Sequence, residues 1–373
     1  MMLTEMSSQR AMAIARWRRV ILLTGGFTVF ALLVGSLLVN MEYRDKTGSR
    51  THYRERMDPR LTEPGFTTAD TALPPGVQPA EVSAGIYVDR IVELSMKDLS
   101  WTVDCYVWFN WKDSSLAPGD NFQVVDGTIE SKEKKDEYVQ GHNHYVLYRI
   151  VARITSIFEE FRFPCDDHLL TICLEEPSYK RQKMIFVADS GNSSVSSRVK
   201  VPGYAIYHES VVEKPHSYKT SRGDPRLNTG AKATFSQFRM GLWIKRDGWG
   251  FFLKMFLPLY VAVAVAILAF FIKPTDIDPR FGLGIGALFA AVANSYITSS
   301  MLPNTGVMSL ADVINIMGTI TILLTLVQST ISLYLYDLKG KKELSNRFDK
   351  ISFYILLAGY VGLNIALPLA AIS

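Results

Sequence analysis

The stretch RFGLGIGALFAAVANSYITSSMLP, residues 280–303, decides what kind of protein this chain is. It has glycine at positions 282, 284 and 286 and no charged residue after Arg280. The spacing G-x-G-x-G differs from the dinucleotide fingerprint G-x-G-x-x-G, which must also follow a strand, whereas an apolar segment precedes this stretch. A helix of about 20 apolar residues crosses a membrane. The stretch therefore predicts a membrane helix, whose small residues either allow close helix packing or line a path for water.

Four further apolar runs are long enough to cross a membrane, at residues 20–39, 255–272, 313–336 and 351–373. They explain a mean hydropathy of +0.11, which is high for a soluble protein. We expect a membrane domain over residues 250–373, with helices at 251–272, 281–302, 310–336 and 351–372. The net charge of +4 comes without a dense basic patch, which argues against a nucleic-acid partner.

Basic residues orient these predicted spans, because cytoplasmic loops collect lysine and arginine. They cluster before the first run and between the last two, whereas the loop after Pro303 and the C-terminus carry none. Residues 1–19 are then cytoplasmic if the first run is retained, and the C-terminus is extracytoplasmic. The run at 20–39 is either a signal anchor or a cleaved signal peptide, and both give the same topology for the later spans. We expect a multi-pass protein of a cell (inner) membrane.

Residues 40–81 and 82–249 differ sharply in composition. The first segment has five prolines, at positions 59, 64, 74, 75 and 79, and reads as an extracytoplasmic linker. The second alternates apolar and mixed positions, as in 102–111 and 146–154, between turn signals such as Pro118-Gly119-Asp120. We therefore expect an all-β, immunoglobulin-like sandwich of about ten strands, followed by a four-helix transmembrane bundle and preceded by an additional membrane helix.

Six short motifs occur in the order of one known family, across residues 84–372. They are WKDSSL at 111–116, FPCD at 163–166, IKR ending at Arg246, FLPLYV containing Pro258, RFGLGIGALF at 280–289, and Leu302-Pro303. In this series the chain resembles the pentameric ligand-gated ion channels, the Cys-loop receptor superfamily, in their bacterial form. The positions matching the disulfide of eukaryotic members are Ser156 and Leu170, so that bond cannot form here. Pro279 stands where cation-selective members often have glutamate, which leaves ion selectivity open.

The resemblance implies that the stretch 280–303 contains the helix that lines the pore. At about 100° per residue, one face of that helix presents Gly282, Gly286, Phe289, Ala293, Tyr296 and Ser300 within an arc of about 80°. Phe289 would form an apolar ring, and such constrictions gate by dewetting. Asn294, Thr298 and Ser299 lie off this arc and either bond neighbouring helices or line water between subunits. Charges at the inner mouth would come from Asp276, Asp278 and Arg280, with Arg280 as a membrane anchor in the alternative interpretation.

The resemblance also assigns coupling and ligand residues. Asp166 and Arg246 would pair where the sandwich meets the membrane domain and, with Pro303, pass movement between them; the plain alternative is a surface salt bridge. Ligand-binding residues would be Glu175, Glu176, Tyr179 and Tyr218, in loops at a subunit interface. Aromatic and acidic side chains together suit an amine through cation–π contact. Ordinary surface-loop roles remain open for all of them.

The sequence thus predicts a homopentameric ligand-gated ion channel, opened by a small-molecule or ion effector and surrounded by membrane lipid. Inorganic ions would cross it passively. The alternative is a non-conducting membrane sensor of the same fold. No Ser/His/Asp or Cys/His set indicates an enzyme, and we expect no cofactor. His142, His144 and the run Cys165–His168 lack the spacing of a closed zinc site. Cys105, Cys165 and Cys173 are either unpaired or include one bridge to Cys105.

Overall fold

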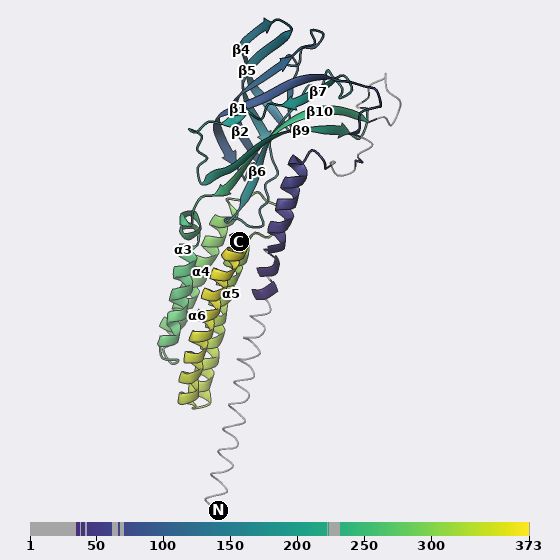
Figure 1. Ribbon diagram of the computed structural model, residues 1–373. Helices are drawn as coiled ribbons and strands as arrows, with labels where there is room; N and C mark the ends of the chain where they lie inside the picture. Colours follow the sequence, from purple (N-terminus) through teal and green to yellow (C-terminus); the bar gives the residue numbers. More distant parts are fainter. Residues whose placement is uncertain are drawn as a thin grey trace, which may run out of the picture.

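The computed structural model describes residues 35–61 except 38 and 42, then 66–67, 71–221, 223 and 232–372. Within these residues the chain forms two parts, a β-sandwich and a bundle of long helices that extends away from one end of it (Figure 1). The predicted fold class, a sandwich followed by four apolar helices, is confirmed.

The sandwich consists of two sheets. The first, sheet A, has the order β4-β5-β2-β1-β7, with β8 also pairing with β1; the second, sheet B, has the order β3-β6-β10-β9. The strands are β1 Ala80–Ser95, β2 Ser100–Trp111, β3 Gln123–Val125, β4 Gly127–Gln140, β5 Asn143–Thr155, β6 Asp167–Glu175, β7 Met184–Ala188, β8 Ser194–Val195, β9 Tyr204–Tyr218 and β10 Ala233–Arg246.

The core lies between the two sheets and follows the alternation that the sequence predicts. In β2 the side chains of Val103, Cys105, Val107 and Phe109 have no exposed surface. Leu170, Ile172 and Leu174 face them from sheet B and are equally buried. Successive side chains of a strand point to opposite faces, so each apolar series lies on one face of its strand. None of Cys105, Cys165 and Cys173, all in the described part of the chain, takes part in a disulfide.

The membrane domain contains four helices that are long and apolar enough to cross a bilayer. They are α3 Gly250–Leu268, continued by η1 Ala269–Phe271; α4 Ile277–Ser299; α5 Leu310–Leu333, continued by η2 Tyr334–Leu338; and α6 Lys342–Ile372. Together they make this chain a multi-pass membrane protein. The helix α4 contains most of the stretch 280–303 and begins slightly earlier than predicted.

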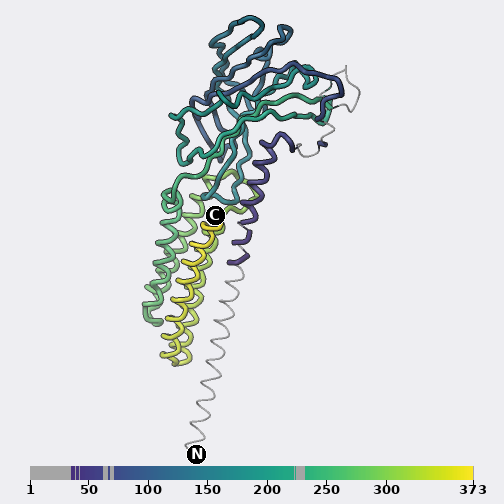
Figure 2. The backbone as a smooth tube through the Cα atoms, in the orientation of Figure 1, coloured from purple at the N-terminus to yellow at the C-terminus, as the bar shows by residue number. Residues whose placement is uncertain are grey.

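A further helix occupies part of the segment expected to be a linker. Most of the predicted anchor at 20–39 lies outside the described residues, but residues 43–57 are helical. This helix, purple in Figures 1 and 2, lies beside the bundle and against the sandwich. Tyr53 and Met57, one turn apart, are buried against Leu169 of sheet B. Gly241 leaves the space that Met57 fills, because a Cβ there would lie 2.9 Å from the Met57 methyl group.

Candidate pore face and coupling site

The helix α4 has one buried and one exposed face in the single chain. The buried face carries Gly284, Ala287, Ala291, Asn294 and Thr298. The structure places all six residues of the predicted pore arc on the exposed face: Gly282, Gly286, Phe289, Ala293, Tyr296 and Ser300. Phe289 is 74% exposed and Tyr296 78% exposed. Two large aromatic side chains of an apolar helix therefore lie on a surface that no described residue of the chain covers.

Polar contacts hold the opposite face of α4 against α5. Asn294 Nδ2 donates to Asn315 Oδ1 at 2.8 Å, and Asn315 Nδ2 donates to Thr298 Oγ1 at 2.7 Å. Gly284 allows the close approach, since a Cβ there would lie 2.4 Å from a methyl carbon of Leu326. Of the two interpretations of Asn294 and Thr298, bonding to a neighbouring helix is therefore the one the structure supports. These contacts fix the rotation of α4 and so determine which residues remain exposed.

The three charges predicted for the inner mouth are not together. Asp276 and Asp278 are exposed, but Arg280 is fully buried inside the bundle. Its Nη2 lies 2.8 Å from Asp349 Oδ1 of α6, and its Nη1 donates to the Ile272 carbonyl at 3.1 Å. Arg280 therefore ties α4 to α6, and its charge is neutralised within the subunit. The local sequence carries no sign of this pairing, because Asp349 is 69 residues away.

Breaking the Arg280–Asp349 pair should destabilise the bundle strongly. We expect Arg280→Gln to lower the free energy of unfolding by about 3–5 kcal/mol, since it leaves a buried carboxylate without its partner. The double variant Arg280→Gln/Asp349→Asn should recover most of that loss, whereas Lys273→Gln, at an exposed base nearby, should have little effect. Thermal unfolding in detergent measures all three, and equal melting temperatures for the two Arg280 variants would contradict the pairing.

The predicted coupling pair forms a buried cluster at the end of the sandwich that faces the bundle. Arg246 donates from Nε to Asp166 Oδ1 at 2.8 Å and from Nη2 to Oδ2 at 3.1 Å. His168 Nε2 lies 2.6 Å from Asp166 Oδ2, and Tyr204 Oη donates to the same oxygen at 2.9 Å. Asp166 is 2% exposed. The pair is therefore no loose surface salt bridge but a bidentate contact supported by two further side chains.

Aromatic rings enclose the guanidinium of Arg246. Its central carbon lies 4.3 Å from the ring centre of Tyr204, 4.6 Å from that of Phe251 and 5.0 Å from that of Phe163. Phe251 belongs to α3 and Phe163 to the loop 156–166, so one side chain contacts the sandwich, the loop and the first membrane helix. Cation–π contacts are strongest where water is excluded, as it is here.

The charge state of Asp166 should make the cluster sensitive to acid. Burial alone would raise the pKa of Asp166, but the hydrogen bond from His168 and the charge of Arg246 outweigh it and hold the pKa well below its ordinary value. The charged form is therefore favoured by folding. Its stabilisation is present above the unfolded pKa, at about pH 4, and is lost as the pH falls further. Arg246 on β10, His168 on β6 and Tyr204 on β9 are the titratable or charged groups that contact it.

We accordingly expect the melting temperatures of the wild type and of Asp166→Asn to differ by a constant amount at mildly acidic and neutral pH. Below about pH 4 the two values should converge, because protonated aspartic acid resembles asparagine. Calorimetry of the protein in detergent across that range measures the difference. A gap that instead narrowed on going from mildly acidic to neutral pH would contradict the assignment.

The loop 156–166 also contacts the start of α5. Leu310 N–H donates to the Phe161 carbonyl at 2.7 Å and Ala311 N–H to the Phe163 carbonyl at 3.0 Å. These are first-turn amides, which have no partner within their own helix. Ser309 caps the same helix, and Thr305 Oγ1 donates to Glu160 Oε2 at 2.9 Å. Pro303 is half-buried at the start of this α4–α5 loop. The sandwich is thus bonded directly to the helix that packs on α4.

Two of the four predicted ligand residues are joined by a side-chain hydrogen bond. Tyr218 Oη donates to Glu175 Oε1 at 2.9 Å, so these two lie together. Glu176 is buried with a raised pKa, caused mainly by burial, and accepts a hydrogen bond from the Ser178 amide at 3.0 Å. Tyr179 Oη accepts the amide of Ala117 at 3.1 Å. Glu176 and Tyr179 are therefore tied to local backbone.

Sequence reasoning missed a cation position close to these residues. Lys132 Nζ lies 4.1 Å from the ring centre of Phe122 and 4.7 Å from that of Tyr148. It also donates to the carbonyls of Gly119 and Asp120, both at 2.8 Å. Two aromatic rings and two carbonyl oxygens thus hold the ammonium group of Lys132.

His168 and Tyr204 were also not predicted as members of the coupling cluster. The sequence does carry a signal for His168, since it lies two residues from Asp166 in the run Cys165–His168. Tyr204 had none, because β9 reaches Asp166 only in the folded sandwich. Among the described residues, no group of three or more His, Cys, Asp or Glu side chains is placed to hold a metal ion.

The fold and the coupling cluster define a class of protein: a multi-pass membrane protein whose β-domain is bonded to its helix bundle. No family model matches the chain. Curated relatives include the gamma-aminobutyric acid receptor subunit beta-4 of Gallus gallus, 19% identical over 74% of this chain and 60% of that subunit. The proton-gated ion channel of Gloeobacter violaceus is 22% identical over 69% of this chain and 74% of its own length. The gamma-aminobutyric acid receptor subunit rho-2 of Homo sapiens is 19% identical over 70% and 60%.

The matches thus span 60% of the length of the two receptor subunits, and none of the three relatives is named as an enzyme. Similarity to receptor subunits and to a proton-gated channel, in a chain with this fold, supports a relationship to the pentameric ligand-gated ion channels.

Proposed function

We propose that this protein is a subunit of a homopentameric ligand-gated ion channel, in which an effector bound to the sandwich opens a passive path for ions. The observation that carries this proposal is the exposed arc of α4. Phe289 and Tyr296 are about three-quarters exposed in the single chain, and the positions between and below them are small or polar. A face of this kind suits a water-filled axis between subunits better than it suits lipid.

Five copies around an axis make this arc the pore wall. Gly282 and Gly286 line the inner half and leave it wide, whereas Phe289 narrows it to an apolar ring. Such a ring excludes water until the helices move apart. Ala293, Tyr296 and Ser300 line the outer half.

The inner mouth of this pore favours cations. Asp276 and Asp278 are exposed at the inner end of α4, while the charge of Arg280 is already neutralised by Asp349. Each subunit then contributes two exposed acids against the one exposed base of Lys273, and rings of acidic side chains attract cations.

Movement passes from the sandwich to α4 in two steps. The Asp166–Arg246 cluster fixes the loop 156–166 to β10 and α3, and the same loop bonds the first amides of α5. Because α5 holds α4 through Asn315, a shift of the sandwich displaces α5 and α4 together. The effector binds at subunit interfaces near Glu175 and Tyr218.

The sandwich lies on the extracytoplasmic side of a cell membrane, which is the inner membrane if the cell has two. The basic residues between α5 and α6 mark the cytoplasmic end of the bundle. Lipid contacts the outer surface of the helices.

The oligomer is the most accessible test of the proposal. Native mass spectrometry of the purified protein in mild detergent should give a particle of five times the 41.9 kDa mass of one chain. The same preparation in liposomes should allow ion flux when the gate is opened. A stable monomer or dimer that carries no flux would overturn the channel assignment.

A further inference from the structure

The helix that precedes the sandwich runs alongside α6 and passes its end. Among the described residues, 35–37, 39–41 and 43–57 are helical. Two contacts align this helix with α6: a Cβ at Gly35 would lie 2.5 Å from a methyl carbon of Leu363, and Lys46 Nζ donates to the Ile372 carbonyl at 2.5 Å. Residue numbers rise together in both contacts, so the two helices are parallel, and Lys46 lies level with the end of α6 (Figure 1).

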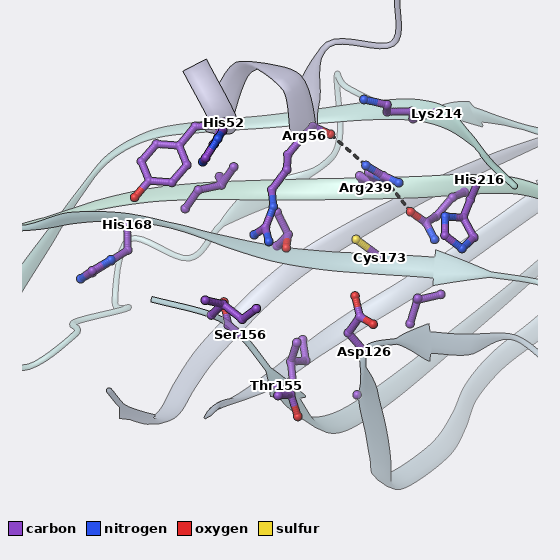
Figure 3. A pocket seen from close by; sticks show the side chains of 18 of the residues that line it. His52, Arg56, Asp126, Thr155, Ser156, His168, Cys173, Lys214, His216 and Arg239 are labelled. Atoms are coloured by element: carbon purple, nitrogen blue, oxygen red, sulfur yellow. Dashed lines mark hydrogen bonds between the residues drawn. The ribbon is translucent and has the colours of Figure 1, made fainter. Parts of the chain in front are cut away.

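Contacts with the sandwich hold the other end of this helix. Figure 3 shows that end, with His52 and Arg56, lying over the strands of sheet B. Tyr53 Oη donates to the Asp167 carbonyl at 2.8 Å, and Arg239 Nη1 donates to the Arg56 carbonyl at 3.0 Å. The helix is therefore held at both ends, which sets the direction of its remaining side chains.

The end of α6 marks one boundary of the hydrocarbon layer. Lys350 is the last charged residue of α6, which is long and apolar enough to cross a membrane. From Lys350 to Ile372 the helix rises about 33 Å, which is close to the ~30 Å thickness of the hydrocarbon core. Ile372 therefore lies at the boundary on the sandwich side, and Lys46 lies there with it.

The exposed side chains of the preceding helix change character at this boundary. Leu37 and Met41, on the hydrocarbon side of it, are exposed and apolar, as lipid-facing side chains are. Tyr43 is exposed close to the boundary, where tyrosine is enriched in membrane proteins. Beyond it the exposed side chains include Arg50 and Arg54. The helix surface thus passes from apolar to basic across the level of the lipid headgroups.

Arg44 and Arg50 are the exposed arginines nearest to the boundary. They lie on either side of exposed Thr47, each about 60° from it around the helix axis and about 4.5 Å from it along the axis. Neither makes an ion pair with a described residue. Asp45, half-buried, is the acid on which the charge of Arg44 acts, whereas the charge of Arg50 acts on Lys46, a second base. Both guanidinium groups are therefore available to an anion from outside the chain.

Headgroup phosphates lie within reach of both arginines. The headgroup region extends about 5–7 Å beyond the hydrocarbon core on each side. Along the helix, Arg50 lies about 6 Å beyond Lys46, and Arg44 lies about 3 Å on the other side, from where its long side chain extends outward. A guanidinium binds phosphate oxygens with two parallel hydrogen bonds. A net negative headgroup adds an attraction that a zwitterionic headgroup lacks.

We propose that the helix at 43–57 binds the headgroups of anionic phospholipids through Arg44 and Arg50, in the leaflet on the sandwich side. His52 Nδ1 of the same helix lies 3.3 Å from Glu159 Oε1 in the loop 156–166. Bound lipid thus holds a helix that contacts the loop next to the coupling cluster. An effect of lipid on gating rests on the proposed channel function, whereas the binding itself does not.

A fluorophore at position 47 reports which lipid lies beside the two arginines. Full-length Thr47→Cys is labelled and placed in nanodiscs that contain equal amounts of phosphatidylglycerol and phosphatidylcholine with the same acyl chains. One lipid at a time carries a doxyl quencher near its headgroup, and labelled wild type gives the background from the native cysteines. We expect the phosphatidylglycerol quencher to act more strongly, with a local preference for this lipid of about fivefold or more.

Variants of the exposed arginines test the assigned contacts. Arg44→Gln and Arg50→Gln should each lower the preference by about fivefold, because one basic residue near the surface contributes an attraction of that size. Arg50→Lys should retain most of the preference, since it keeps the charge. Arg54→Gln, at an exposed arginine about 12 Å beyond Lys46, should leave it unchanged. Substitutions at such exposed positions are expected to leave folding intact.

Three results would overturn the proposal: equal quenching by the two lipids, a preference that survives in Arg44→Gln/Arg50→Gln, or an equal loss in Arg54→Gln. None of them bears on flux through the pore. Conversely, a protein that shows the expected preference but carries no flux would retain the lipid site and refute the channel assignment.

Discussion

Replacing Phe289 with alanine should produce a channel that conducts ions in the absence of effector. Phe289 is the largest apolar side chain in the middle of the exposed arc, with small residues on the arc on either side of it. Alanine in every subunit removes the ring that excludes water from the axis, and a wider constriction remains hydrated. We expect the leak flux through proteoliposomes to exceed that of the wild type by about tenfold or more, which corresponds to a shift of about 1.4 kcal/mol or more in the gating equilibrium.

A matched control separates this effect from general loosening of the bundle. Ile297→Ala shortens an exposed apolar side chain on the same helix, about 80° from Phe289 around the axis. Its leak should stay near that of the wild type. Equal fluxes from Phe289→Ala and the wild type, in a preparation that otherwise conducts, would remove Phe289 as the gate.

Replacing Arg246 with glutamine should disconnect the sandwich from the pore. The change leaves the buried carboxylate of Asp166 without its bidentate partner, and it removes the cation that Tyr204, Phe163 and Phe251 enclose. Loss of one partner from a buried ion pair costs about 3–5 kcal/mol. We expect a channel that assembles less stably and no longer opens from the sandwich side.

Combining this variant with the leaky gate distinguishes lost coupling from lost assembly. The double variant Arg246→Gln/Phe289→Ala should still leak, because the altered constriction lies far from the cluster and needs no signal to conduct. Lys245→Gln, at the exposed neighbour on β10, should behave as the wild type in both backgrounds. A double variant without leak but with normal assembly would show that the cluster shapes the pore itself.

The sequence was most informative where a single local pattern determines the structure. Alternation of apolar residues in β2 and β5 was enough to predict the sandwich, because burial on one face of a strand repeats at a fixed period. The long apolar runs were enough to predict the four membrane spans. The exposed arc of α4 followed from the same helical period, applied to Gly282, Phe289 and Tyr296. The pairing of Asp166 with Arg246 came from the resemblance to a family and not from periodicity.

Contacts between distant segments could not be read in this way. From the sequence, Arg280 was a candidate for a charge at the inner mouth of the pore, because Asp349 lies beside it only in the folded bundle. The composition of residues 40–81 taken together suggested a linker and concealed the helix at 43–57. The prolines responsible begin at Pro59, after the helix has ended. Tyr53 and Met57, at helical spacing, were the signal that a shorter window would have found.

Accessibility of Ala293 tests the central claim, that this face of α4 lines a conducting axis, most directly. In the Phe289→Ala background, Ala293→Cys provides a thiol on the arc one turn from the ring, and the leak current is recorded while a positively charged methanethiosulfonate is added from the sandwich side. We predict that modification abolishes most of the current, with no change in the same background lacking the new cysteine. A current that persists after mass spectrometry has confirmed full modification of Cys at this position would contradict the account.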